Sequence, residues 1–143
     1  MTVISSASRR TVVQDENHSS QLTYVLITPA RNEERFIEKL IQSMVNQTVL
    51  PLKWVIVNDG STDATASIVG KYAAGHDWIE LVNLSAHRDR SFAAKVHAFN
   101  AGFERVKELQ FDVVGNLDSD VSFDVDYLEF LLGKFTKRGG KVD

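Results

Sequence analysis

Four short apolar runs are spaced along the chain, and each one stops abruptly at polar residues. They are rich in Val, Ile and Leu and cover residues 24–27, 54–57, 78–84 and 111–117. Runs of this length and composition are typical of strands that are buried on both faces of a parallel sheet. We therefore expect four strands, and Thr28-Pro29 should stop the first because proline cannot donate to a central ladder.

A segment in which apolar residues recur at helical spacing follows each of these runs. Asn32 is expected to start the first helix as its cap, Ser61-Thr62-Asp63 to begin the second, and Asp124 to cap the last. The third segment has the cleanest stripe, which we expect to pack on the core: Phe92, Val96, Phe99, Phe103 and Val106. Strand and helix in alternation predict βαβ units, and hence an α/β fold whose parallel sheet carries helices on both faces.

Length and composition restrict this fold to one domain. With 143 residues and 43% hydrophobic content, the chain can bury one core and is too short for two domains of ordinary size. Residues 1–21 are rich in Ser, Thr, Gln, Asn and Arg without a sustained period. We expect a flexible segment there and the ordered domain over residues 22–143.

Charge and residue usage exclude several function classes. The formal charge is a mild -3 and the Lys and Arg residues are scattered, which does not indicate a nucleic-acid-binding surface. The absence of cysteine excludes disulfides, thiolate metal sites and a Cys nucleophile. No apolar run approaches the roughly 18 to 20 residues of a membrane span, and the first residues do not resemble a signal peptide. The expected location is the cytoplasm, with peripheral association at the cytoplasmic face of a membrane left open.

Polar side chains collect where the expected strands end. The carboxyl ends of parallel strands meet at one edge of the sheet, where open α/β sheets bind ligands. The last run stops at Asp118-Ser119-Asp120, whose two carboxylates could hold a divalent cation through oxygen ligands. Taken alone, this triplet fits an acidic turn or a helix cap better. Neither Gly-x-Gly-x-x-Gly nor a P-loop sequence is present, which argues against two common kinds of nucleotide site.

Four motifs at these strand ends resemble, in the same order, the motifs of family 2 glycosyltransferases with the GT-A fold. They are Thr28-Pro29-Ala30-Arg31-Asn32-Glu33, Val57-Asn58-Asp59-Gly60-Ser61-Thr62-Asp63, Ala94-Lys95-Val96-His97-Ala98-Phe99-Asn100-Ala101-Gly102 and Leu117-Asp118-Ser119-Asp120. The resemblance covers about residues 22–137, and the order of the four motifs is more specific than any one of them. It implies a Rossmann-like fold that binds a nucleotide-diphosphate sugar and transfers the sugar to an acceptor.

The resemblance also implies roles for individual residues. The implied donor-binding residues are Pro29, Asn32, Glu33, Asp59, Lys95 and Asp118. Asp120 is implied to bind Mn2+ or Mg2+, which would act as a Lewis acid on the departing nucleoside diphosphate. Asp59 would accept a hydrogen bond from a ring N–H of the base, such as N3–H of uracil, which favours a UDP-sugar. Lys95 would offset the charge of the diphosphate.

Several of these residues also fit simpler interpretations. Asp59 with the following glycine fits a plain turn, and Lys95 fits a solvated lysine on a helix. Asp63 is better explained as a structural acid in the first turn of a helix, and Ser119 as a small spacer.

The chain departs from the family pattern at two positions. Arg31 stands where the family often has an aromatic residue, so base stacking would have to use the arginine plane, which can also bind phosphate. Ala94 replaces the usual glycine, and Arg88 or Arg90 in the loop after the third run could share the role of the lysine. His87 and His97 are not expected to bind a metal, because a hard cation prefers oxygen.

The catalytic general base of an inverting transfer is not identified in this sequence. The family carries it in the second half of the domain, and the nearby Asp124 and Asp126 fit the cap and first turn of a helix. We therefore expect this chain to be the donor-binding half of a glycosyltransferase domain, without most of the half that binds the acceptor. The alternative is a non-catalytic nucleotide-sugar-binding or assembly module. A receiver domain is disfavoured, because no paired acids follow the first run.

The strand expected at residues 111–117 would then have an open edge. An unpaired strand edge is a template for another strand, so we expect self-association through this edge or the helix beside it. The sequence does not indicate the donor sugar, the acceptor or the oligomeric state.

Overall fold

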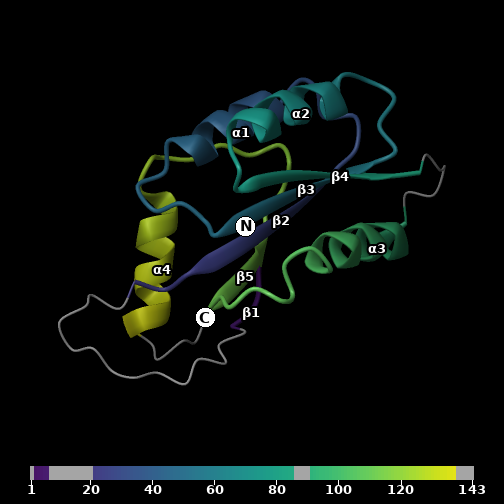
Figure 1. Cartoon of the computed structure of the whole chain (residues 1–143). Coiled ribbons are helices and arrows are strands. Elements are labelled where there is room, and N and C mark those ends of the chain that lie inside the picture. The colour runs from purple at the N-terminus through teal and green to yellow at the C-terminus, as the bar shows by residue number, and fades with distance from the viewer. Residues whose placement is uncertain (1, 7–20, 86–90, 138–143) are drawn as a thin grey trace.

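The structure is a computed structural model that describes residues 2–6, 21–85 and 91–137, and it contains one sheet with helices on both faces (Figure 1). In chain order the elements are β1 (Thr2–Ser6), β2 (Tyr24–Ala30), α1 (Ile37–Val45), β3 (Lys53–Asp59), α2 (Thr65–Gly75), β4 (Ile79–Leu84), α3 (Phe92–Phe103), β5 (Val113–Asn116) and α4 (Tyr127–Lys137). The strands β5, β2, β3 and β4 are parallel, each followed by a helix. The four-stranded parallel sheet predicted from the apolar runs is confirmed.

The strand order reverses beside β2. Along the sheet the order is β1-β5-β2-β3-β4, so the chain moves outward from β2 to β4 and then returns to place β5 on the other side of β2. Open α/β sheets bind ligands at the carboxyl ends of strands where the order reverses in this way. The ends of β2 and β5 are therefore the place to look for a site.

Large side chains form the core between the sheet and α1, α2 and α4. Leu40, Met44 and Trp54 are fully buried in this cluster. The indole N–H of Trp54 donates to Oγ1 of Thr28 at 2.8 Å, which satisfies a polar atom inside the core. The apolar face expected for the first helix is thus confirmed.

The opposite face of the sheet is covered by α3, which meets it through small residues (Figure 1). The buried residues of this helix are Ala94, Ala98 and Gly102. A Cβ atom on Gly102 would lie 2.6 Å from Cγ2 of Ile27 and 2.9 Å from Cγ2 of Val57. The glycine is what lets α3 lie directly on β2 and β3.

The expectation that the stripe of large side chains on this helix packs on the core is wrong for its first half. Phe92 is 80% exposed and Val96 is 40% exposed, whereas Phe99 and Phe103 are partly buried and Val106 is buried. In the first half of α3 the large side chains lie on the side away from the sheet, because the positions that face the sheet are occupied by Ala and Gly.

The expectation of a flexible segment over residues 1–21 is wrong for residues 2–6. These form β1, which pairs antiparallel with β5 from Thr2 opposite Asn116 to Ser6 opposite Val113. β-branched residues lead this segment, and the edge of β5 offers them a ladder of N–H and C=O groups. The edge of β5 that was expected to be open is therefore paired with β1. The unpaired edge from which self-association was predicted is absent from the described structure. Residues 7–20 lie outside the described residues.

Two predicted helix caps are also wrong. α1 begins at Ile37 after Phe36, and Asn32 lies upstream with a φ of 53° in the connecting loop. The cap of α4 was expected from Asp124. It comes instead from Gln47, whose Oε1 accepts from the backbone N–H of Leu128 at 3.1 Å. Local sequence could not show this second cap, because it is supplied by a distant residue.

The first parallel strand is longer than expected. β2 continues through Pro29, which pairs with Val57 of β3, while the ladder between β2 and β5 ends earlier, at Ile27. Proline is thus tolerated at the end of this central strand, beyond its pairing with β5.

Candidate functional site

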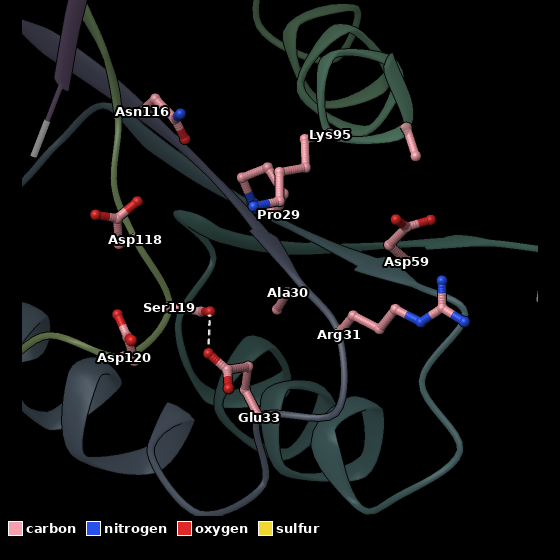
Figure 2. Close-up of a pocket in the computed structure, with 11 residues that line it drawn as sticks. Pro29, Ala30, Arg31, Glu33, Asp59, Lys95, Asn116, Asp118, Ser119 and Asp120 are labelled. Atoms are coloured by element: carbon pink, nitrogen blue, oxygen red, sulfur yellow. Dashed lines mark hydrogen bonds between the residues drawn. The ribbon is translucent and has the colours of Figure 1, made fainter. Parts of the chain in front are cut away.

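A cavity of about 480 Å³ lies at the carboxyl ends of β2, β3 and β5, where the strand order reverses (Figure 2). Its lining comes from three strand ends and the first turn of α3: Pro29, Ala30, Arg31, Glu33, Asp59, Ala94, Lys95, Asn116, Asp118, Ser119 and Asp120. Segments far apart in the sequence thus converge at the sheet edge, as the alternation of strands and helices predicted.

The acidic loop, residues 118–120, follows β5 at one side of the cavity. The preceding Leu117 is buried, and its backbone N–H donates to the carbonyl of Ile27 at 3.0 Å, which holds the loop beside β2. Asp118 and Asp120 are exposed, while Ser119 between them is buried. The two carboxylates are therefore available to a ligand in the cavity.

Ser119 is more than the small spacer that was expected. Its hydroxyl donates a hydrogen bond of 2.6 Å to Oε2 of Glu33, which extends from the loop after β2 (Figure 2). The acidic loop is thus tied to the neighbouring strand end by side chains as well as by its backbone.

The two carboxylates of the acidic loop are suitable ligands for a hard divalent cation, since such cations prefer oxygen. Within the described residues, no group of three or more His, Asp or Glu side chains is placed to hold a metal ion. Asp118 and Asp120 would therefore supply part of a ligand set, which water and phosphate oxygens would complete.

Asp59 ends β3 and lies across β2 from the acidic loop (Figure 2). It is 8% exposed and lines the cavity. The following Gly60 has a φ of 72°, a conformation that favours glycine, and Oδ1 of Asn58 accepts from the backbone N–H of Ser61 at 3.1 Å. A tight turn thus fixes the strand end that carries Asp59.

The loops after β2 and β3 are braced against each other. Oδ1 of Asn32 accepts from the backbone N–H of Thr62 at 2.8 Å, and the backbone N–H of Asn32 donates to Oγ of Ser61 at 2.9 Å. The backbone N–H of Glu33 donates to Oγ1 of Thr65 at 2.8 Å. Asn32 does not line the cavity, so the structure gives it a supporting position.

Asp63 is part of the same bracing. Its Oδ1 accepts from the backbone N–H and the hydroxyl of Thr65, at 2.9 and 2.5 Å, and its Oδ2 accepts from the N–H of Glu34 at 3.1 Å. Desolvation raises the pKa of Asp63, but the hydrogen bonds from Thr65 and Glu34 outweigh it and lower the pKa below its usual value. The structural role expected for this acid is confirmed, but Asp63 lies just before α2, which begins at Thr65, and not in its first turn.

The first turn of α3 supplies the remaining wall of the cavity. Ser91 caps the helix, and its hydroxyl accepts from the backbone N–H of Ala94 at 3.3 Å. Ala94 and Lys95 follow in this turn and line the cavity. A lysine and the positive end of a helix dipole thus face the same space, an arrangement that favours anions.

Most of the predicted site residues meet in this one cavity. Of the residues implied to bind donor or metal, all but Asn32 line it. Arg31 also lines it and extends toward Asp59 in Figure 2. The residues 86–90, with His87, Arg88, Asp89 and Arg90, lie outside the described residues, and His97 is exposed on α3 away from the cavity lining.

The sequence interpretation missed Asn116. This residue ends β5 and lines the cavity, and its Oδ1 is buried without a hydrogen-bond partner among the described residues. The signal that could have revealed it is an amide side chain inside an otherwise apolar run.

Comparison with known proteins decides the family. The model of the family described as "Glycosyl transferase family 2" matches residues 25–142, which include all the strands and loops that form the cavity. The chain belongs to glycosyltransferase family 2. The resemblance carried by the four ordered motifs is confirmed.

Relatives of this family 2 chain include 4,4'-diaponeurosporenoate glycosyltransferases of Staphylococcus aureus. The protein of strain bovine RF122 / ET3-1 is 33% identical over 126 residues, which cover 87% of this chain and 30% of the relative. The protein of strain USA300 is 33% identical over 117 residues, which cover 81% of this chain and 29% of that relative. The family 2 chain thus spans about a third of the length of these relatives.

Solved structures confirm the GT-A fold of the family 2 chain. TarS residues 1–349 of S. aureus, in complex with UDP, superpose with a TM-score of 0.65 at 22% identity, over 82% of this chain and 33% of that TarS fragment. The mannosyltransferase PcManGT from Pyrobaculum calidifontis, in complex with GDP-Man and Mn2+, gives a TM-score of 0.57 at 25% identity, over 73% and 29% of the two chains. In the described part of the family 2 chain, no helix is both long and apolar enough to cross a membrane.

Proposed function

We propose that this chain binds a nucleotide-diphosphate sugar and forms the donor-binding part of a glycosyltransferase that works by metal-assisted inverting displacement. The observation that carries the proposal is the cavity at the strand reversal, which brings Asp59, Lys95 and the acidic loop together in a family 2 domain. The carboxylate of Asp59 lies at one side of this cavity, those of the acidic loop lie at another, and the ammonium group of Lys95 lies at a third. Such a distribution suits an elongated ligand with a hydrogen-bonding base and a diphosphate.

Each side of the cavity has a chemical task in this proposal. Asp59 accepts a hydrogen bond from a ring N–H of the base, and Pro29 forms the floor between base and diphosphate. Lys95 and the start of α3 offset the negative charge of the diphosphate. Asp118 accepts from a hydroxyl of the ribose or the sugar. Asn116 adds a buried acceptor for another such hydroxyl.

Asp120 is the residue that would hold Mn2+ or Mg2+ directly. The bound cation would act as a Lewis acid that stabilises the charge of the leaving nucleoside diphosphate. The acidic loop offers two carboxylates, so phosphate oxygens would have to complete the ligand set of the cation. Binding of the cation and binding of the diphosphate should therefore be strongly coupled. Asn32 would support donor binding indirectly, by bracing the loop after β2 against the loop after β3.

A UDP-sugar is the donor that we propose. TarS has been solved with UDP and with UDP-GlcNAc, whereas PcManGT has been solved with GDP-Man and Mn2+. Uracil offers a single ring N–H, at N3, and Asp59 can accept from it. We further propose that the reaction takes place in the cytoplasm or at the cytoplasmic face of a membrane.

Calorimetry tests this proposal. UDP-, GDP- and dTDP-sugars are titrated into the protein with and without Mn2+, and the same titrations are made with Asp120→Asn. We expect metal-dependent binding with a preference for UDP-sugars, and its loss in the variant. Failure of every donor to bind in the presence of Mn2+ would refute the proposal.

A second candidate function is a nucleotide-sugar-binding module that performs no transfer. It is favoured by one observation: Asp124 and Asp126, the described carboxylates just downstream of the acidic loop, do not line the cavity. Release of UDP from a bound donor separates the two functions. Release faster than in Asp120→Asn indicates a catalytic centre and excludes the module, because a module that performs no transfer does not cleave the donor.

A further inference from the structure

The hydrogen bond between Ser119 and Glu33 links two loops that are far apart in the sequence. The 2.6 Å bond joins residues separated by 86 positions. Ser119 is only 8% exposed, so its hydroxyl has little access to water and depends on this acceptor. The bond is thus a partly buried contact rather than one on the open surface.

Glu33 is held firmly at its backbone. Its N–H donates to Oγ1 of Thr65 at 2.8 Å, and its carbonyl accepts from the N–H groups of Phe36 and Ile37 at 3.0 and 2.9 Å. Thr65 is completely buried and is itself bonded to Asp63. Glu33 therefore projects its carboxylate from a rigid support that extends to the start of α2.

The acidic loop, in contrast, has few side-chain anchors. Of the side chains of residues 118–123, that of Ser119 is the one with a hydrogen bond to another described element. Asp118 and Asp120 flank it and are both exposed. The orientation of these two carboxylates thus depends on how the residue between them is held.

The position of Glu33 does not suit a direct metal ligand. One of its carboxylate oxygens already accepts from Ser119, and Glu33, Asp118 and Asp120 do not form a group that is placed to hold a metal ion. A hydrogen bond to Ser119 requires an acceptor atom at this position but no negative charge.

We infer that Glu33 is a positioning residue: by accepting the hydroxyl of Ser119 it sets Asp118 for the hydroxyl of the ribose or sugar and Asp120 for the cation. Glu33 lines the same cavity but binds neither the cation nor the donor itself. This inference rests on the proposed function. It revises the role implied by the family resemblance, in which Glu33 belonged to the residues that bind the donor.

Four variants test the inference: Ser119→Ala, Glu33→Met, Glu33→Gln and the double variant Ser119→Ala/Glu33→Met. The readout is the Kd of UDP in the presence of Mn2+, measured by calorimetry. Ser119→Ala and Glu33→Met should each weaken binding about 10-fold, the lower limit for losing a group that orients a metal ligand. Glu33→Gln should stay within about twofold of the parent, because the amide oxygen still accepts from Ser119. The double variant should be no weaker than either single variant, because both remove the same interaction.

Glu34→Met is the matched control. Oε1 of Glu34 accepts from the backbone N–H of Ala64 at 3.2 Å, so this variant also removes an acceptor between loops but leaves the acidic loop alone. Its Kd should stay within about twofold of the parent. The midpoint of thermal unfolding without ligand is measured for every variant, and a purely structural role would change this midpoint while leaving the Kd of the folded protein unaltered.

The outcomes separate the inference from the proposed function. If the parent protein binds no UDP-, GDP- or dTDP-sugar with Mn2+, the proposed function fails and the inference fails with it. If the parent binds but Ser119→Ala has no effect on the Kd, the inference alone is overturned. A Glu33→Gln variant as weak as Glu33→Met, or losses that multiply in the double variant, would show that the charge of Glu33 acts directly on the ligand.

Discussion

The two faces of the sheet are packed in different ways. On one face α1, α2 and α4 bury large side chains such as Leu40, Met44 and Trp54. On the other face α3 lies on β2 and β3 through Ala94, Ala98 and Gly102. The first face resembles an ordinary hydrophobic core, whereas the second is a close contact between a helix and a sheet.

The close contact has a consequence for the candidate site. Ala94 is both a buried contact of α3 and part of the cavity lining, and Lys95 follows it. How near α3 lies to the sheet therefore decides where Lys95 stands relative to the strand ends. One face mainly supplies stability, and the other also determines the shape of the cavity.

A large loss of stability is expected from truncating the core on the first face. Leu40→Ala removes a fully buried side chain from the large cluster, and it should lower the free energy of unfolding by about 2–5 kcal/mol. Urea denaturation measures this as a lower midpoint with an unchanged m-value. Leu50→Ala, at a position 44% exposed, is the matched control and should lose clearly less. Equal losses at the two positions would contradict this description of the core.

The second face should be sensitive to added volume instead. Gly102→Ala places a Cβ against Ile27 and Val57, so it should destabilise the protein by about 1–3 kcal/mol. Because α3 must move outward to relieve the contact, binding of UDP with Mn2+ should weaken as well. Both effects are measured on the same preparation, by urea denaturation and by calorimetry.

Gly133→Ala is the control for this prediction. Gly133 lies within α4, and a Cβ there would meet nothing within 4 Å, so alanine should be neutral or stabilise by up to about 1 kcal/mol. If Gly102→Ala behaved like Gly133→Ala, the close contact of α3 with the sheet would be refuted.

This contrast also explains which elements could be predicted from the sequence. The strands and α1 follow from local patterns of large apolar side chains, so the four parallel strands were found. α3 was assigned as a helix, but Phe92 and Val96 were wrongly expected to pack on the core and the buried Ala and Gly positions were missed, because Ala and Gly contribute little to a hydrophobic pattern. β1 was missed because a five-residue segment becomes a strand only beside a partner such as β5.

The candidate site shows the same limit. Its charged residues were found because motifs at strand ends are local, and the parallel sheet brings those ends together. The contact between Ser119 and Glu33 in the site was not found, because it joins distant residues, and the same holds for the cap that Gln47 gives to α4 at Leu128. No spacing or motif in a single sequence indicates such pairs.

A smaller loss of stability is expected from a buried polar contact on the first face. Thr28→Val keeps the volume but leaves the indole N–H of Trp54 without its acceptor, which should cost about 1–2 kcal/mol. Thr48→Val is the control, since the hydroxyl of Thr48 donates to Glu129 at an exposed position and its loss should cost less than about 0.5 kcal/mol. A loss at Thr28 no larger than the loss at Thr48 would show that the indole finds another acceptor.

The smallest effect is expected at the outer side of the second face. Phe92 is 80% exposed, so Phe92→Ser removes little buried area and should change the free energy of unfolding by at most about 0.5 kcal/mol. Phe111→Ala is the comparison on the same face of the sheet, where a 4% exposed ring packs in the core and its loss should cost about 3–5 kcal/mol. If the stripe of large residues on α3 faced the core, both variants would be severely destabilised. A difference of several kcal/mol between them would instead confirm that Ala94, Ala98 and Gly102 form the inward side of the helix.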